Sequence, residues 1–214
     1  MITLIEALNY RCLRYVSQPL ERFHVLVGPN ASGKTTFLDV IAFLGDLVNE
    51  GIEAAITKRS PNYDDLTFGR TGRGIQLAIE AKIPSEFLDK VIGERRFHYI
   101  RYEIALQKDE ETHEVMLQSE ILRFLEESSY SQTQRTLFPK SSAVPDSILL
   151  TSEKRDSRAI ITKGDKDSFW DETGKEAWLH KYKLGPRRSA LANLPEDESS
   201  FPVATWIKEL LTEG

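Results

Sequence analysis

A glycine-rich stretch constrains this chain more than any other feature of its sequence. Residues 28–36 read Gly-Pro-Asn-Ala-Ser-Gly-Lys-Thr-Thr and fit the pattern G-x-x-x-x-G-K-S/T. The apolar residues 23–27 before them predict a short buried strand, and apolar residues from Phe37 to Val48 recur at helical spacing. Strand, loop and helix therefore occur in the order in which this pattern binds phosphate.

The chemistry of phosphate binding accounts for the residue types in this loop. Backbone N–H groups at a helix N-terminus converge on an anion, and the helix dipole favours its charge. Gly28 and Gly33 leave room for the backbone to approach the ligand. We expect Lys34 to reach the β- and γ-phosphates as the catalytic cation, and the Thr35 hydroxyl to bind Mg²⁺. The predicted nucleotide cradle consists of Gly28, Pro29, Asn30, Ala31, Ser32, Gly33, Lys34, Thr35 and Thr36. The alternative interpretation is a glycine turn that caps an ordinary helix.

Composition restricts the remaining possibilities. The chain has 214 residues, of which 40% are hydrophobic and 29% charged, as in soluble globular proteins. Its net charge of −5 argues against a surface built throughout for nucleic-acid backbones, although local basic clusters leave DNA contact possible. No apolar run approaches the ~20 residues that a membrane span needs, and the N-terminus does not resemble a secretory signal. Cys12 is the single cysteine, which suits a reducing cytoplasm, and we expect it in the core.

Alternating apolar residues predict antiparallel strands both before and after the glycine-rich loop. We treat the chain as one domain, with a strand–loop–helix core at 1–57, an antiparallel β layer at 75–125 and a hairpin and helical extension at 126–214. The expected strands and hairpins are 2–8 with 13–16, 75–83, 99–107 with 115–124, 148–150, and 158–162 with 168–170. The expected helices are 34–50, 52–56, 84–92 and one that begins near residue 201.

Hydrolysis requires a second element that the sequence does not supply. The usual element is an apolar strand ending in Asp or Asp-Glu, which holds magnesium and polarises the attacking water. Residues 148–150 are followed by Thr-Ser-Glu, a poor match, and no Leu-Ser-Gly-Gly signature occurs. We therefore expect this chain to be the N-terminal portion of a nucleotide-binding unit, with turnover dependent on a missing C-terminal half.

Several segments resemble one family. Residues 2–8 with Asn9-Tyr10-Arg11 resemble the opening strand and N-F-K/R turn of RecF, SMC and OLD-type ABC ATPases, and residues 25–39 resemble their loop and helix. Residues 185–191 are similar to a stretch in RecF-like ATPases. The resemblance implies an α/β fold, a P-loop NTPase of ABC-ATPase type with an added antiparallel β layer.

The same resemblance implies function and partners. Such heads bind ATP and Mg²⁺ and form a dimer around the nucleotide, either as a homodimer or with a partner that carries the signature. Hydrolysis then acts as a switch in DNA repair, DNA maintenance or phage defence, without a membrane. The resemblance also implies roles for individual residues: Asn30 as a donor to phosphate, Arg11 near the nucleotide, Lys58 or Arg59 in a partner- or DNA-sensing loop, and Gln132 or Gln134 as the glutamine that contacts water.

Three other functions remain as alternatives. A GTPase is suggested by Thr162-Lys163-Gly164-Asp165, which mimics the guanine-reading N/T-K-x-D motif. However, the D-x-x-G sequence at 171–174 follows it, in the wrong order, so a turn between strands explains these residues better. A small-molecule kinase would need an arginine-rich lid, for which Arg187-Arg188 is thin support. A nucleotide-binding and dimerisation module without turnover fits the missing carboxylate.

Overall fold

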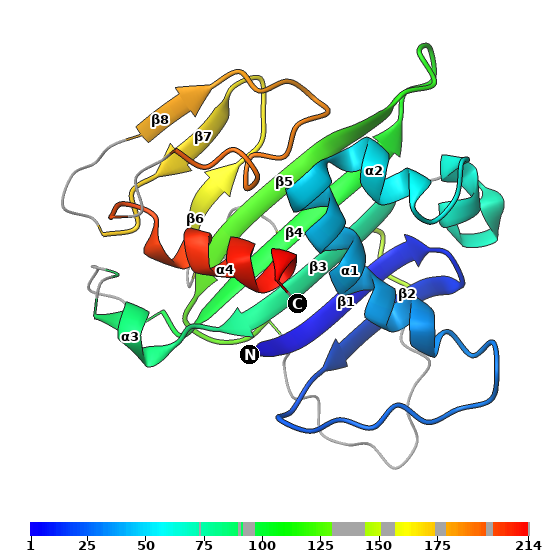
Figure 1. The fold of residues 1–214 in the computed structure, drawn as a ribbon, viewed down its shortest axis with the longest axis horizontal. Helices are drawn as coiled ribbons and strands as arrows, with labels where there is room; N and C mark the ends of the chain where they lie inside the picture. The colour runs from blue at the N-terminus through cyan, green and yellow to red at the C-terminus, as the bar shows by residue number, and fades with distance from the viewer. Residues whose placement is uncertain are drawn as a thin grey trace.

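Eight strands form one antiparallel sheet in the computed structural model of the chain (Figure 1). The structure describes residues 1–72, 74–89, 91, 97–129, 144–150, 157–173, 179–195 and 199–213. The order across the sheet is β2-β1-β3-β4-β5-β6-β7-β8. The strands are β1 (Ile2–Tyr10), β2 (Leu13–Pro19), β3 (Ile75–Lys82), β4 (Tyr99–Lys108), β5 (Val115–Leu125), β6 (Ser157–Thr162), β7 (Asp167–Trp170) and β8 (Leu179–Tyr182).

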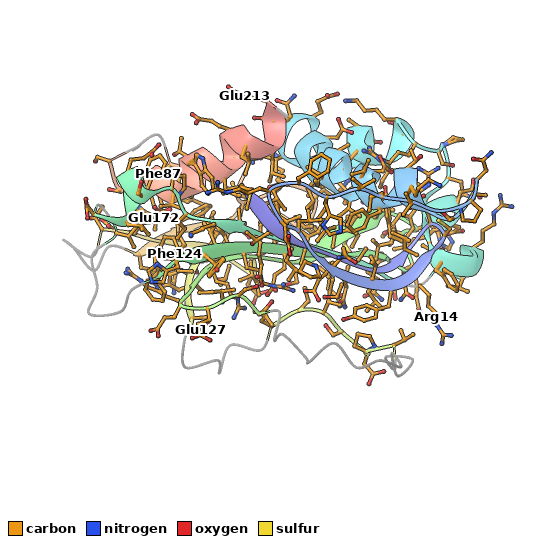
Figure 2. The ribbon with its side chains drawn as sticks, turned by 90° about the horizontal axis from the view of Figure 1, so that it is seen from below. Arg14, Phe87, Phe124, Glu127, Glu172 and Glu213 are labelled. Carbon is orange, nitrogen blue, oxygen red and sulfur yellow. The ribbon has the colours of Figure 1, made fainter. Side chains whose placement is uncertain are left out.

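The larger helices lie together on one face of this sheet, as Figure 2 shows from the side. The α-helices are α1 (Lys34–Glu50), α2 (Ile52–Thr57), α3 (Ser85–Leu88) and α4 (Pro202–Thr212), with 3-10 turns η1 (Tyr63–Leu66) and η2 (Phe68–Arg70). The buried residues of α1 recur every three or four positions, from Phe37 to Val48, and pack on the apolar side of the central strands. Gly51 ends α1, because its φ of 93° lets its N–H reach the carbonyls of Asp46 and Leu47. The main core is therefore the layer between these helices and the sheet.

The hairpins and long helices agree with the sequence predictions. The pairs β1–β2, β4–β5 and β6–β7 are confirmed, as are α1, α2, β3 and the C-terminal helix. The short strand β8 was not predicted, since Leu179–Tyr182 contains charged and ring residues without apolar alternation. Within the described residues, no helix has the length and apolar character that a bilayer crossing demands.

Three predictions are wrong. Residues 23–27 form no strand and, apart from the partly buried Leu26, lie exposed, because β1 is already paired with β2 on one side and β3 on the other. Residues 148–150 also form no strand, since their backbone groups bond to side chains instead of to a neighbouring strand. Cys12 is exposed rather than in the core, because it lies in the turn between β1 and β2.

Gly45 on α1 packs against the backbone of α4 at Leu211. A Cβ atom at this position would overlap the carbonyl oxygen of Leu211. Alanine normally stabilises a helix interior by about 1 kcal/mol relative to glycine. Here we expect Gly45→Ala to lower the free energy of unfolding by about 1–3 kcal/mol, because α4 has to shift.

Chemical denaturation tests this expectation. Gly164→Ala is the matched control, since Gly164 lies in an exposed turn and its nearest atom would be 3.7 Å away. It should change the free energy of unfolding by less than about 0.5 kcal/mol. Equal stability of Gly45→Ala and the unchanged chain would contradict the close packing of α1 against α4.

A carboxyl group from a distant segment caps α4. Glu172 is fully buried, and its carboxylate oxygens accept hydrogen bonds of 2.7 Å from the backbone N–H groups of Val203 and Ala204. Burial raises the pKa of Glu172 to about 8, against the opposing effect of these two donors. The protonated carboxyl group is therefore the form that the folded chain favours below this pH.

This raised pKa predicts a pH dependence of stability. The stabilisation from protonated Glu172 should be complete below its ordinary pKa of 4.5 and should be lost as the pH rises through about 8. Glu172→Gln should therefore flatten the decline in the free energy of unfolding between pH 5 and 8. Urea denaturation at both pH values measures the difference, and an unchanged decline in the variant would refute the assignment to Glu172.

Candidate nucleotide-binding site

The glycine-rich loop forms a compact turn at the N-terminus of α1. Gly33 caps the helix with a φ of 90°, and Ala31 also adopts a left-handed φ of 62°. The ammonium group of Lys34 folds back on the loop and donates to the carbonyl oxygens of Gly28 at 2.8 Å and Pro29 at 2.6 Å. It also lies 3.2 Å from the Ser32 hydroxyl. The structure therefore brings the predicted cation and the predicted loop together at one helix end.

A side chain at Gly33 would be strained, whereas one at Gly28 would require the Ser32 side chain to move. A Cβ on Gly28 would lie 2.8 Å from Ser32 Oγ, and one on Gly33 would lie 3.2 Å from Cys12 Sγ and from a methyl carbon of Leu13. Gly33 additionally needs its positive φ, which side chains disfavour. The loop is thus packed against the β1–β2 turn. A glycine turn that only caps a helix would not require this packing.

The remaining loop residues fall into two groups. Asn30, Ala31 and Thr35 are exposed to solvent, so the Thr35 hydroxyl is open to a hydrated metal ion. Thr36 is half-buried and accepts a long hydrogen bond of 3.4 Å from Cys12 Sγ, which directs it toward the β1–β2 turn. Among the described residues, no cluster of three or more His, Cys, Asp or Glu side chains could hold a metal ion.

Asp39 anchors this helix to the segments around it, a role that the sequence did not reveal. Its carboxylate accepts hydrogen bonds from the Tyr10 hydroxyl at 2.5 Å and from Arg59 Nε at 2.8 Å, and it pairs with Arg11 at 3.2 Å. Burial, followed by the hydrogen bond to Asp39, raises the pKa of Tyr10, which keeps its hydroxyl protonated as the donor. One carboxylate on α1 therefore fixes the β1–β2 turn and residue 59 against the helix that carries the loop.

The basic residues proposed as sensors are held by the same helix. Lys58 lies 2.6 Å from Asp46 and 2.5 Å from Glu50, and Arg59 lies 2.7 Å from Asp46. Although burial acts to raise it, the hydrogen bonds from Lys58 and Arg59 lower the pKa of Asp46. The side chain of Arg59 is only 7% exposed. These pairs leave little free charge at this position for DNA or a partner. Gln132 and Gln134 lie outside the described residues.

The guanine-reading motif is a turn between β6 and β7, at the opposite side of the molecule from the glycine-rich loop (Figure 1). Lys163 pairs with Asp167 at 3.2 Å and donates to the carbonyl oxygen of Arg188 at 2.7 Å. Its side chain is 4% exposed, so it is a structural residue of this turn. This placement favours the turn interpretation over the GTPase.

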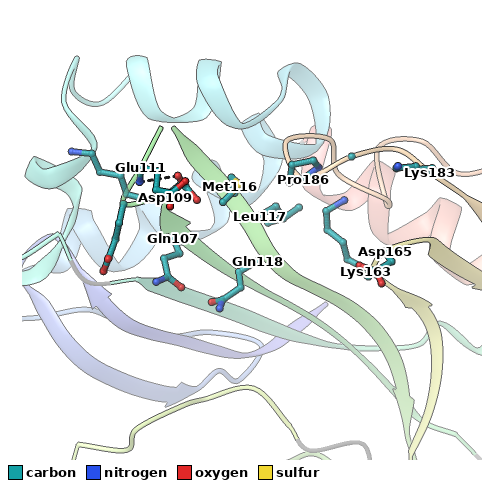
Figure 3. A pocket seen from close by; sticks show the side chains of 14 residues that line it. Gln107, Asp109, Glu111, Met116, Leu117, Gln118, Lys163, Asp165, Lys183 and Pro186 are labelled. Atoms are coloured by element: carbon teal, nitrogen blue, oxygen red, sulfur yellow. Dashed lines mark hydrogen bonds between the residues drawn. The ribbon is translucent and has the colours of Figure 1, made fainter. Parts of the chain in front are cut away.

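Two hollows lie away from the loop. One of about 770 Å³ opens between the end of the β4–β5 hairpin, the β6–β7 turn and residues 183–186, and mixed charges line it (Figure 3). The other, of about 400 Å³, lies beside α2 and includes Arg187. Arg187 pairs there with Glu53 at 3.1 Å and Glu114 at 3.4 Å. These ion pairs engage the arginine that the kinase alternative would place in a lid over the substrate.

Comparison with known proteins decides the class. The family model described as an AAA ATPase domain matches residues 1–183, which include the whole glycine-rich loop. The chain belongs to this ATPase family. Membership confirms the prediction that the chain is a P-loop ATPase. It also confirms the predicted α/β fold class with its antiparallel layer. The ATPase family also implies that ATP is the nucleotide.

The other comparisons are more distant. No curated protein matches the chain. Among solved structures, the chain is similar to one from work on the ATP-driven dimerization and DNA-stimulated activation of SMC ATPases. The identity is 22% and the TM-score 0.40, over 56% of this chain and 68% of that one. Family membership and the geometry of residues 28–36 therefore point to the nucleotide site.

Proposed function

We propose that this chain is the nucleotide-binding portion of an ATPase head that uses binding and hydrolysis of Mg-ATP as a dimerisation switch. The observation that carries the proposal is the Lys34 ammonium folded onto the loop between Gly28 and Gly33 at the start of α1. A positive helix end, converging N–H groups and a lysine suit a triphosphate. Dimerisation would occur through the nucleotide face, with a second copy or with a partner that carries the signature. DNA repair, DNA maintenance or phage defence is the proposed setting.

An exposed apolar segment supports the need for a further element. Phe23, Val25 and Val27 are 83%, 60% and 86% exposed, directly before the loop. A row of large apolar side chains in water is unfavourable and marks a surface that another segment covers. We propose that a strand carrying the missing Asp or Asp-Glu pairs here, where its carboxylate would lie beside Thr35 and polarise the attacking water.

The alternative is a module that binds nucleotide and dimerises without turnover. It is favoured by the described strands after the loop: β4 and β7 are followed by Asp-Glu pairs, but Asp109 accepts the N–H of Thr112 in its own turn and Glu172 caps α4. The two functions differ in hydrolysis and share ATP binding, so both quantities have to be measured on one sample.

Steady-state phosphate release by the purified chain is the test. We expect release near background while Mg-ATP still binds, because the water-activating carboxylate has to come from the further element. A longer reading frame that adds this element should restore turnover, and Lys34→Ala should then abolish it. Robust turnover by the present chain, lost in Lys34→Ala, would show that the carboxylate is already within these residues and would overturn this part of the proposal.

A further inference from the structure

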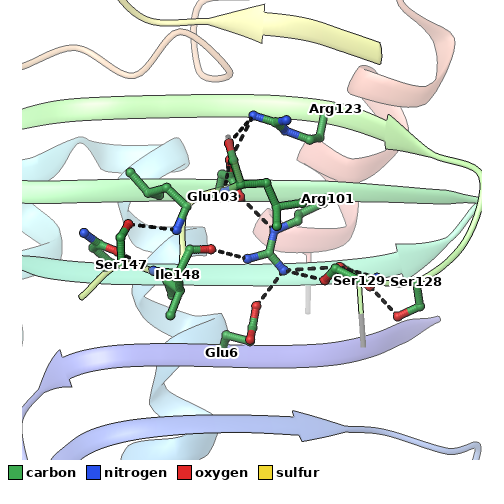
Figure 4. A network of polar contacts seen from close by, with 12 residues as sticks. Glu6, Arg101, Glu103, Arg123, Ser128, Ser129, Ser147 and Ile148 are labelled. Carbon is green, nitrogen blue, oxygen red and sulfur yellow. Dashed lines mark hydrogen bonds and ion pairs between the residues drawn. The ribbon is translucent and has the colours of Figure 1, made fainter. Parts of the chain in front are cut away.

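A short segment outside any helix or strand crosses the face of the sheet that the helices leave uncovered. We call residues 144–150 the strap. Figure 4 shows that side chains of β3, β4 and β5 bond to the main chain of the strap. Gln76 Oε1 accepts the N–H of Ile148 at 2.8 Å, and Arg101 donates to the carbonyl oxygen of Ile148 at 2.8 Å. The sheet thus pairs with both backbone groups of this one residue.

The same arrangement repeats two residues later. The Glu103 carboxylate accepts the N–H of Leu150 at 3.2 Å, and Arg123 donates to its carbonyl oxygen at 3.0 Å. The chain bends at Leu149 between these two residues, and the N–H of Leu149 donates to Ser147 Oγ at 3.1 Å. Four side chains of the sheet therefore bind the backbone of a bent peptide at positions i and i+2.

One side chain of the strap supplies a specific contact. Ile148 is 6% exposed and packs with Leu8 and Ala78, with Tyr15 beside them, in a small cluster separate from the main core. Peptide recognition combines two parts: hydrogen bonds to the main chain give affinity, and a pocket for one side chain gives specificity.

The surface beneath the strap is charged instead of apolar. Arg101 lies 2.7 Å from Glu6, 3.2 Å from Glu80 and 2.7 Å from Glu103, and Arg123 lies 3.2 Å from Glu103. Water solvates such groups well, so uncovering them does not carry the cost of exposing an apolar core. Three carboxylates outnumber two guanidinium groups here, which disfavours nucleic acid as an occupant.

We propose that this face is a binding site for a peptide of the form Ile-x-Leu, which the strap fills as an internal ligand and a partner protein's segment enters by exchange. The site goes beyond nucleotide binding, because it lies on the face of the sheet opposite α1. The partner segment has isoleucine at the position of Ile148 and needs free backbone groups two residues later, so proline is excluded at both positions.

A labelled peptide of sequence Val-Pro-Asp-Ser-Ile-Leu-Leu tests the site by fluorescence anisotropy. Ile148→Glu places a charge in the apolar cluster and should open the strap. We expect this variant to bind the peptide saturably, 1:1 and at least about tenfold more tightly than the unchanged chain does. Glutamate in place of the peptide's isoleucine, or Gln76→Ala in the opened variant, should each weaken binding. A folded Ile148→Glu chain that binds neither peptide, or both equally, overturns the proposal.

Hydrogen exchange of the unchanged chain provides a test that does not depend on how the variant folds. The amides of Ile148 and Leu150 should exchange through local opening, at least about 100-fold faster than those of Ile79 and Ile104 in the central strands. Exchange at the same rate as the central strands would mean that the strap leaves only on global unfolding, and it would overturn the proposal.

Discussion

Replacing Arg101 with methionine is expected to lower the free energy of unfolding by about 3–5 kcal/mol. The Arg101 side chain is fully buried and pairs with Glu6, Glu80 and Glu103 (Figure 4). Its removal leaves the buried Glu80 carboxylate without this cation, while Glu103 keeps Arg123. An unpaired buried charge is far more costly than a lost surface contact. Urea denaturation monitored by circular dichroism measures the change.

Two comparisons separate charge from packing. Arg187→Met removes an arginine whose side chain is 41% exposed and whose partners are also exposed, so it should change stability by less than about 1 kcal/mol. Combining Arg101→Met with Glu80→Gln removes one buried charge of each sign, leaves Glu103 paired with Arg123, and should recover most of the lost stability. If Arg101→Met costs no more than Arg187→Met, the buried network does not exist as described.

Replacing Lys34 with alanine is expected to weaken Mg-ATP binding by about 10- to 100-fold. The variant removes the cation that the loop holds between Gly28 and Ser32, and charge-assisted hydrogen bonds contribute roughly 1.5–3 kcal/mol each. The free energy of unfolding should change little, because the hydrogen-bond partners of Lys34 are exposed atoms of the loop. Titration calorimetry gives the affinity, and thermal denaturation verifies that the variant is folded.

Lys58→Ala is the matched control for this variant. Lys58 is also a lysine near α1, but its partners are Asp46 and Glu50 instead of the loop. Its loss should leave the ATP affinity within about twofold, since this exposed ion pair lies away from the cradle. Equal affinities for Lys34→Ala and the unchanged chain would remove Lys34 from the site.

Sequence patterns predicted the helices and strands whose formation depends on neighbouring residues in the chain. Strict alternation located β3 and the β4–β5 hairpin, because one side of each strand packs on the core. Helical spacing and a terminal glycine located α1 and its end at Gly51. The loop residues 28–34 were also predictable, since their chemistry is confined to one continuous stretch of chain.

Long-range contacts account for what the sequence did not reveal. Residues 23–27 have the apolar character of a strand, but the described structure offers them no neighbouring strand. Cys12 is at the exposed β1–β2 turn, because β1 ends at Tyr10 and the chain reverses before β2 begins at Leu13. The hydrogen-bond and ion-pair partners of Asp39 are at positions 10, 11 and 59, and no sequence spacing predicts that these residues meet. The network around Arg101 likewise joins strands far apart in the chain.

Titration of the folded chain with Mg-ATP and with Mg-GTP shows whether residues 28–36 form a nucleotide site. We expect saturable binding of one Mg-ATP per chain, no preference for GTP, and a large loss of affinity in Lys34→Ala. No affinity of the folded chain for any nucleotide, or tight binding that is selective for GTP, would contradict this expectation.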